Sequence, residues 1–341
     1  AAIERQLTPR HDAWFAYNMG EPAAVAAVAA GLRERLGLPF ADEDILLTSG
    51  AFAGLAVSLV TIADPGDEVI FNSPPWFCYE PMIAGQGLAP VRVRVDMASF
   101  DLDLAAIEAA IGPRTRAVIV NSPNNPTGKI YPPATLEALA ALLTRASERH
   151  GRPIFLLSDE SYSRVLFTGS AFVSPSRFYP YTLVIYTYGK TLLTPGQRMG
   201  YLALSPHMPG REALWQALDV SRYTMGLAVP NAVLQYALPE LDALSIDLGL
   251  LEHKRDRLVG GLRALGYEAT LPEGTFYVVV RSPLADDWAF AAWLAERKVF
   301  VLPGQVCELP GYLRLSLTAS EPMVERALPV FAEAIRAFAG R

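Results

Sequence analysis

Short apolar runs alternate with helical patterns along the first two thirds of the chain. The runs read "DILLTS", "DEVIFN", "VRVRV", "RAVIVN", "IFLLSDE", "TLVIYTY" and "MGYLALS". Each is rich in Val, Ile, Leu or aromatic residues and ends in polar residues, which is typical of a buried strand. Strands that alternate with helices favour a mostly parallel central sheet flanked by helices, that is, an α/β fold.

One of the intervening helices has clear boundaries. Residues 134–151, "ATLEALAALLTRASERHG", carry apolar residues at helical spacing. Arg149 and His150 fall in the last turn, and Gly151 follows as a stop signal. We predict a crossover helix between two strands here.

The pattern changes after about Arg222 and indicates a second, smaller domain. The later segments are a helix at 251–266, a strand "TFYVVV", a helix at 287–298, a strand "YLRLSLT" and a closing helix from Glu321. This order is typical of an α+β domain. We place the boundary between Thr224 and Leu248, which gives a large α/β domain at 17–230 and a small domain at 231–341. Residues 1–16 are expected to pack with the small domain.

Composition agrees with a two-domain enzyme. The 341 residues exceed what one hydrophobic core usually serves, and 51% of them are hydrophobic. The net charge is -6 and no basic block occurs, which argues against nucleic-acid binding. Two cysteines form no disulfide framework or metal motif, so we expect a cytoplasmic protein without a bound metal.

The longest apolar stretch, residues 51–63, is too short to span a bilayer and has helix-forming composition. We recognise no signal peptide. The chain begins "AAIERQL", so the sequence leaves open whether an N-terminal segment precedes it.

Candidate chemistry lies just after the strand runs, since ligands of open α/β sheets bind beyond the carboxyl ends of the strands. Residues 121–130, "NSPNNPTGKI", combine two prolines with a glycine. Proline fixes φ and glycine permits positive φ, so this segment is predicted to be a rigid turn that positions a side chain.

Two more clusters follow strands. In "LLTSGAF", Ser49 and Gly50 stand before a helix, where free backbone amides can bind a phosphate. An ordinary N-cap serine explains the same pattern equally well. In "SDESY", Asp159 and Glu160 emerge from a buried run, where a carboxylate needs a positive partner such as a cationic ligand atom. The alternative is that Asp159 caps a turn.

The segment "YTYGKTLLTPGQRMGY" is the most informative. Lys190 follows a strand and precedes Arg198 by eight residues. An amine that is buried or lies close to other cations has a lowered pKa. This favours its neutral form, which is the nucleophile of Schiff-base chemistry. An arbitrary lysine is more often a surface residue, but the neighbours of Lys190 favour a functional role.

Taken together, the motifs "SGAF", "SPPWFCY", "NSPNNPTG", "SDESY", "YGKTLLTPGQRMGY" and "YLRLSLT" resemble those of the class I/II aminotransferases. These are pyridoxal 5'-phosphate (PLP) enzymes of the aspartate aminotransferase fold, called fold type I. The resemblance runs in family order from about Tyr17 to Arg341. It implies an enzyme that moves an amino group from an L-α-amino acid to a 2-oxo acid by a ping-pong ketimine mechanism.

The resemblance also implies roles for single residues. Lys190 matches the lysine that binds PLP covalently and moves the substrate α-proton. Asp159 matches the carboxylate that pairs with the protonated pyridine nitrogen. Asn125 and Tyr162 match the hydrogen-bonding partners of the cofactor's phenolic oxygen.

For the cofactor phosphate, the resemblance implies contacts from five residues. The backbone amides of Gly50, Ala51 and Phe52 would hold it. Thr187 would add a hydroxyl, and Arg198 a guanidinium that can bind two phosphate oxygens at once.

Further contacts are implied for the ring, the substrate and a second subunit. Trp76 would stack on the pyridine, and Arg314 would clamp the substrate α-carboxylate, with Asn125 and Trp76 also touching substrate. Tyr17 resembles the tyrosine lent to the neighbouring subunit's phosphate, which implies a homodimer with shared sites. The alternatives are a core tryptophan at Trp76 and a surface strand arginine at Arg314.

The sequence leaves the exact reaction open. Tyr188, Gly189 and the proline of "LLTPGQ" depart from many relatives, and these departures bear on the substrate rather than on the cofactor. A fold type I C–S (β) lyase would use the same cofactor residues. A PLP-binding regulatory domain is a more distant alternative, since no helix-turn-helix segment is visible. The amino donor and the keto acceptor cannot be read from the motifs.

Overall fold

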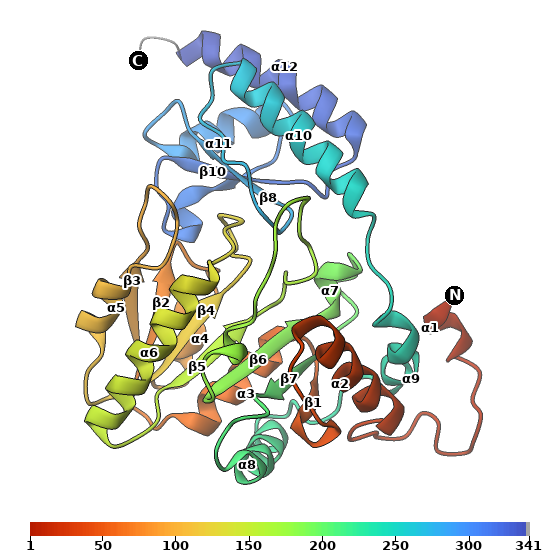
Figure 1. Cartoon of the computed structure of the whole chain (residues 1–341). Helices are drawn as coiled ribbons and strands as arrows, with labels where there is room; N and C mark the ends of the chain where they lie inside the picture. Colours follow the sequence, from red (N-terminus) through yellow and green to blue (C-terminus); the bar gives the residue numbers. More distant parts are fainter. Residues whose placement is uncertain (339–341) are drawn as a thin grey trace.

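The computed structural model describes residues 1–338 and contains two sheets. The large sheet has seven strands in the order β1-β7-β6-β5-β4-β2-β3 (Figure 1). They are β1 (Ile45–Thr48), β2 (Glu68–Ser73), β3 (Ala89–Arg94), β4 (Thr115–Asn121), β5 (Phe155–Asp159), β6 (Thr182–Thr187) and β7 (Gly200–Leu204). All seven predicted strands are therefore present.

The sheet is mostly parallel, as predicted, and β7 is its exception. Strands β3, β2, β4, β5 and β6 pair in parallel, whereas β7 pairs antiparallel with both β6 and β1. In the register, Asn121 lies opposite Asp159, and Thr187 lies opposite Gly200. The ends of β4, β5 and β6 thus meet at one edge, where the polar motifs follow.

Helices cover both faces of this sheet. The longer helices of this part are α2 (Pro22–Leu36), α3 (Ala51–Ile62), α4 (Tyr79–Gly85), α5 (Leu104–Ala110), α6 (Pro133–His150), α8 (Arg211–Thr224) and α9 (Ala232–Leu241). Four short helices lie between or before them: α1 (Ala2–Arg5), η1 (Asp42–Asp44), η2 (Pro175–Arg177) and α7 (Tyr188–Thr191). Successive strand residues alternate between faces: Leu156 packs in the core with α6, while Leu157 packs in the core with α3. Helix α6 confirms the predicted crossover helix and ends at Gly151 in the left-handed conformation.

Helix α3 is buried along most of its length, between the sheet and helix α8. Its apolar residues extend around most of the helix, as expected for a helix that is buried in the core of a large protein. Among residues 1–338, no helix has both the length and the apolar character needed to cross a membrane.

The C-terminal part contains an antiparallel sheet in the order β8-β10-β9. Its elements are α10 (Leu248–Ala264), β8 (Tyr277–Arg281), α11 (Asp287–Glu296), β9 (Leu302–Pro303), η3 (Gly304–Cys307), β10 (Tyr312–Ser316) and α12 (Glu321–Phe338). Figure 1 shows α10 and α12 side by side on the outer side of this sheet, away from the large sheet. The predicted helices and strands of this region are confirmed.

Helix α9 lies beyond the predicted boundary at residue 230 but packs with the large sheet. Leu234 and Leu238 share a buried cluster with Val28 of α2 and Ile45 of β1. In the N-terminal segment, Trp14 stacks on Tyr236 of α9, with ring centroids 3.6 Å apart. The N-terminal segment thus contacts α9, which itself packs with the large sheet. The division into two domains stays a prediction.

The large sheet and the C-terminal sheet are joined by a close contact at the turn predicted for residues 121–130. Gly128 adopts a φ of +74°, and a Cβ on it would lie 2.3 Å from Cβ of Pro272. The backbone amides of Glu273 and Gly274 both donate hydrogen bonds to the oxygen of Gly128, at 3.0 and 3.1 Å. This backbone contact requires glycine at 128 and fixes the small sheet against the end of β4.

Candidate active site

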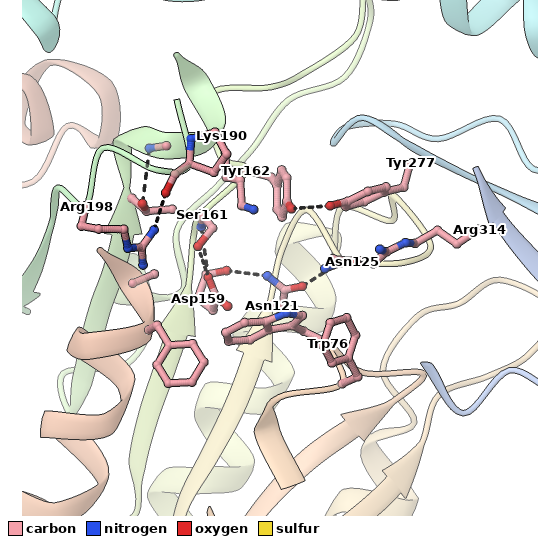
Figure 2. Close-up of a pocket in the computed structure, with 16 residues that line it drawn as sticks. Trp76, Asn121, Asn125, Asp159, Ser161, Tyr162, Lys190, Arg198, Tyr277 and Arg314 are labelled. Carbon is pink, nitrogen blue, oxygen red and sulfur yellow. Dashed lines mark hydrogen bonds between the residues drawn. The ribbon is translucent and has the colours of Figure 1, made fainter. Parts of the chain in front are cut away.

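A cavity of about 250 Å³ lies at the edge of the large sheet where β4, β5 and β6 end. Its walls come from the first turn of α3, the segment after β2, the turn after β4, the region around α7, and the small sheet. Figure 2 shows Lys190, Asp159, Asn125 and Arg314 around this common space. The motifs, which lie far apart in sequence, therefore share one cavity.

Asp159 ends β5 and is 4% exposed. Its Oδ1 accepts hydrogen bonds from the amide and the hydroxyl of Ser161, and its Oδ2 accepts one from Tyr79 at 2.6 Å. Burial raises the pKa of the Asp159 carboxyl above its ordinary value, although the bonds from Ser161 and Tyr79 and the charge of Lys190 oppose this rise. A cationic ligand atom would favour the ionised carboxylate.

The turn after β4 is rigid, as the prolines and glycine predict. Asn121 accepts a hydrogen bond from the amide of Asn125 at 2.7 Å and donates one to the oxygen of Asp159. The amide of Gly128 donates to the oxygen of Asn124 at 2.7 Å. Asn125 is thereby held in the cavity wall.

Arg314 reaches the same wall from β10. Its Nη1 donates a hydrogen bond to Oδ1 of Asn125 at 2.8 Å, and its guanidinium lies 4.1 Å from the ring centroid of Tyr277. Within residues 1–338, no carboxylate forms an ion pair with Arg314. The guanidinium is therefore oriented but keeps donors for an incoming anion.

Lys190 lies in α7, directly after β6, and lines the cavity. Its Nζ is 5.7 Å from the ring centroid of Tyr162. Tyr162 is 3% exposed, and its hydroxyl donates to the hydroxyl of Tyr277 at 3.3 Å. Burial raises the pKa of Tyr162 well above its ordinary value, so its phenol remains a hydrogen-bond donor at neutral pH.

The other end of the cavity is built to bind an anion. Helix α3 begins at Ala51, so its first backbone amides, including that of Phe52, lack partners within the helix. A Cβ on Gly50 would lie 2.8 Å from Nη2 of Arg198, so glycine permits the close approach of this guanidinium. Thr187 also lines the cavity; its hydroxyl accepts a hydrogen bond from the amide of Gly189 and donates one to the oxygen of Met199, both at 3.3 Å.

Aromatic side chains form a further part of the wall. Trp76 packs edge-to-face against Tyr79 and Phe52, with ring centroids 5.4 and 5.5 Å away. It is half-buried and lines the cavity rather than the core alone.

Gly50 lies beside Arg198 but is not among the residues that line the cavity. Tyr17 is the predicted site residue that lies apart from the cavity. Its side chain is 90% exposed and does not line this chain's cavity. The predicted role of Tyr17 in a neighbouring subunit stays a prediction.

The sequence interpretation missed several side chains of the site. Tyr79 and Ser161 lie inside quoted motifs, "SPPWFCY" and "SDESY", but no role was assigned to them. Tyr277 begins a strand that could be read as core, yet it stands beside Arg314. Phe77 also lines the cavity. No spacing rule identifies such contacts, because they join separate elements.

The donor set fits PLP. A buried carboxylate with a raised pKa, a lysine and a buried phenol face the same cavity. At the anion-binding end, the Nη1 of Arg198 donates only to the oxygen of Pro195, and no described carboxylate pairs with it. No group of three or more His, Cys, Asp or Glu placed to hold a metal ion occurs in the described part of the chain.

A family model and the similar proteins of known sequence both indicate the same family. The model for aminotransferase class I and II matches residues 5–331. Aspartate/prephenate aminotransferase from Thermus thermophilus is 36% identical over 333 residues, which cover 94% of this chain and 83% of that protein. These matches do not favour the lyase alternative.

Solved structures agree with this result. An aminotransferase from Eubacterium rectale superimposes with a TM-score of 0.94 at 29% identity, covering 99% of this chain and 86% of that one. The aspartate aminotransferase from Thermus thermophilus with maleate gives a TM-score of 0.86 at 33% identity, covering 98% and 86%. The predicted fold type I architecture is thus confirmed.

Proposed function

Because the chain belongs to aminotransferase class I and II, we propose that it uses PLP to move an amino group from an L-α-amino acid to a 2-oxo acid. The observation that carries this proposal is the presence of Lys190, Asp159 and Arg314 in the walls of one cavity. An amine, a buried carboxylate and a guanidinium without a carboxylate partner among the described residues are groups that this reaction would use.

When bound, PLP supplies an electron-withdrawing ring that stabilises negative charge at the substrate α-carbon. Asp159 would keep the ring nitrogen protonated, since a cation next to this carboxylate favours the ionised form of Asp159. Lys190 would hold the cofactor covalently and, once free, take the proton from the α-carbon. Asn125 and Tyr162 would bond the phenolic oxygen.

The phosphate would lie at the N-terminus of α3, against the amides of Ala51 and Phe52. Backbone amides and the helix dipole both favour an anion at this position. Arg198 and the hydroxyl of Thr187 would complete the phosphate site, and Trp76 would cover the ring. The distribution of donors in the cavity supports this orientation.

At the other end, Arg314 would bind the α-carboxylate through two parallel hydrogen bonds. Asn125, which already accepts a hydrogen bond from Arg314, orients the guanidinium for that contact. The α-hydrogen would then point consistently toward Lys190.

We also propose a homodimer in which Tyr17 of one subunit serves the phosphate site of the other. The 90% exposure of Tyr17 supports the idea that it serves a site outside its own cavity. A cytoplasmic location stays a prediction; the two free cysteines, Cys78 and Cys307, agree with it.

Covalent labelling tests the proposal directly. The purified protein is incubated with PLP, reduced with borohydride and mapped by peptide mass. The chain has four lysines, Lys129, Lys190, Lys254 and Lys298, and of these Lys190 lines the cavity. We expect the label on Lys190 and its loss in Lys190→Ala, with Lys298→Ala as the matched control. A label on another lysine would overturn the assignment.

The type of reaction is tested separately with one equivalent of amino acid. An aminotransferase releases the corresponding 2-oxo acid while the amino group stays on the cofactor. A C–S lyase would instead release pyruvate and ammonia from a β-substituted substrate.

A further inference from the structure

We propose that the substrate side chain binds an aromatic wall formed by Phe52, Trp76 and Phe77, so that the enzyme prefers large apolar amino acids to aspartate. This inference rests on the proposed function and adds the substrate class to it. The three residues come from the first turn of α3 and from the segment between β2 and α4.

Charge in the cavity provides the first argument. Its cationic lining residues in the described part of the chain are Lys190, Arg198 and Arg314. In the proposed function these three already serve the covalent link, the phosphate and the α-carboxylate. Among this chain's own lining residues, a second substrate carboxylate would lack a cationic partner, and a desolvated carboxylate without a partner is strongly disfavoured. The aspartate half-reaction below also tests whether the neighbouring subunit supplies that cation.

Exposure of the aromatic rings provides the second argument. Phe52 is 47% exposed and Phe77 is 42% exposed, although both line the cavity. Trp76 joins them: its ring centroid lies 5.5 Å from that of Phe52, at an interplanar angle of 87°, and 6.4 Å from that of Phe77. Apolar area that water still reaches is available for a substrate side chain.

Energetics indicate how much selectivity to expect. Burying apolar area contributes about 25 cal/mol per Å², and each extra methylene in an apolar pocket changes specificity by roughly tenfold. A benzyl or isobutyl side chain of the substrate would bury apolar area against the aromatic wall. A side-chain carboxylate at the same place would lose its hydration. The Thermus thermophilus aspartate aminotransferase was solved with maleate, a dicarboxylate, so the preference of this chain would differ from that relative's.

The test measures the second-order rate constant of the half-reaction between the PLP-loaded enzyme and single amino acids. Phenylalanine and leucine should react at least about tenfold faster than aspartate and glutamate. An equal or faster reaction of aspartate would overturn this inference and leave the proposed function intact. If no amino acid reacts, the proposed function itself fails.

Variants of the wall provide an independent readout. Phe77→Ala should slow the reaction of phenylalanine about tenfold and that of alanine much less, because the short methyl group makes fewer contacts with the wall. Phe300→Ala is the matched control, because Phe300 is 79% exposed and does not line the cavity. Equal losses for phenylalanine and alanine would show that Phe77 is structural and would overturn its assignment to a side-chain subsite.

Discussion

The hydroxyl of Tyr79, in the first turn of α4, donates a 2.6 Å hydrogen bond to Oδ2 of Asp159 at the end of β5. Eighty positions separate the two residues in the sequence. Tyr79 is 2% exposed, so this bond lies in a dry environment behind the cavity. Tyr79 therefore positions the Asp159 carboxylate, which lines the cavity.

The variant Tyr79→Phe should lower kcat/KM about tenfold, since a hydrogen bond to a charged group contributes about 1.5–3 kcal/mol. Its pH profile should also change. The Tyr79 bond lowers the pKa of Asp159, so its loss raises that pKa and moves the acidic limb of kcat/KM to higher pH. The measurement is kcat/KM between pH 5 and pH 9.

Tyr179→Phe is the control for this variant. Tyr179 is also buried and donates its hydroxyl hydrogen bond to the oxygen of Ile154, away from the cavity. It should alter stability without moving the pH profile. An unchanged profile in Tyr79→Phe would mean that the bond does not tune Asp159.

Replacing Arg314 by lysine should reduce kcat/KM for amino acids about tenfold to a hundredfold, although the charge is retained. An ammonium is a point donor and cannot form two parallel bonds to a carboxylate, which removes about 1.5–3 kcal/mol. The control substrate is a simple amine without a carboxylate, whose slow reaction should hardly change. If amine and amino acid suffer equally, another residue must bind the carboxylate.

Glu160 should make stability depend on pH. It is 2% exposed, and burial raises its pKa from 4.5 to about 7, although Ser174 and Ser158 donate hydrogen bonds to it. Between these two values the unfolded chain releases the proton and the folded chain keeps it. Stability from this group is thus fully present below pH 4.5 and is lost as pH rises toward 7.

Urea unfolding of the protein and of Glu160→Gln across this pH range checks the prediction. The difference in unfolding free energy, protein minus variant, should fall by on the order of 3 kcal/mol between the two pKa values and then stay constant. Gln retains an oxygen that can accept from both serines. A difference that does not vary with pH would show that Glu160 is already ionised at neutral pH.

Alanine at position 128 should destabilise the protein more than alanine at another glycine of similar conformation. Gly128→Ala adds backbone strain and a clash with Pro272, together about 2–5 kcal/mol. Gly151→Ala is the matched control: its φ is +66°, but no atom lies within 4 Å of the added Cβ. Thermal unfolding should show a clearly lower Tm for Gly128→Ala, whereas equal losses would mean that the contact with Pro272 relaxes freely.

Much of the secondary structure could be predicted because strand and helix periodicities are local. The order of strands in the sheet could not, because it depends on contacts between distant segments; the antiparallel pairing of β7 is an example. Helix α9 contains Pro239 and gives no clean helical signal, so its packing on the large sheet was not expected.

The candidate site shows the same limit. Asp159 ends β5, and Asn125 and Lys190 lie in the segments that follow β4 and β6. Residues at the ends of parallel strands converge at one edge of the sheet. Tyr79 and Tyr277 reach the site from elements whose position the pattern does not specify. The contacts of Tyr79 and Tyr277 with the site depend on tertiary packing, which the spacing of residues in the sequence does not predict.

The contact between Gly128 and the loop at Glu273 also affects how much conformational entropy the site loses when a ligand binds. The carboxylate of Glu273 accepts a hydrogen bond from the amide of Ile130 at 2.7 Å and pairs with Lys129 at 3.0 Å. These bonds, with those to the oxygen of Gly128, form when the chain folds, and they bring the strand of Arg314 beside Asn125. The conformational freedom of Arg314, the proposed carboxylate clamp, is therefore lost during folding, so this part of the cavity wall is preorganised before a ligand binds.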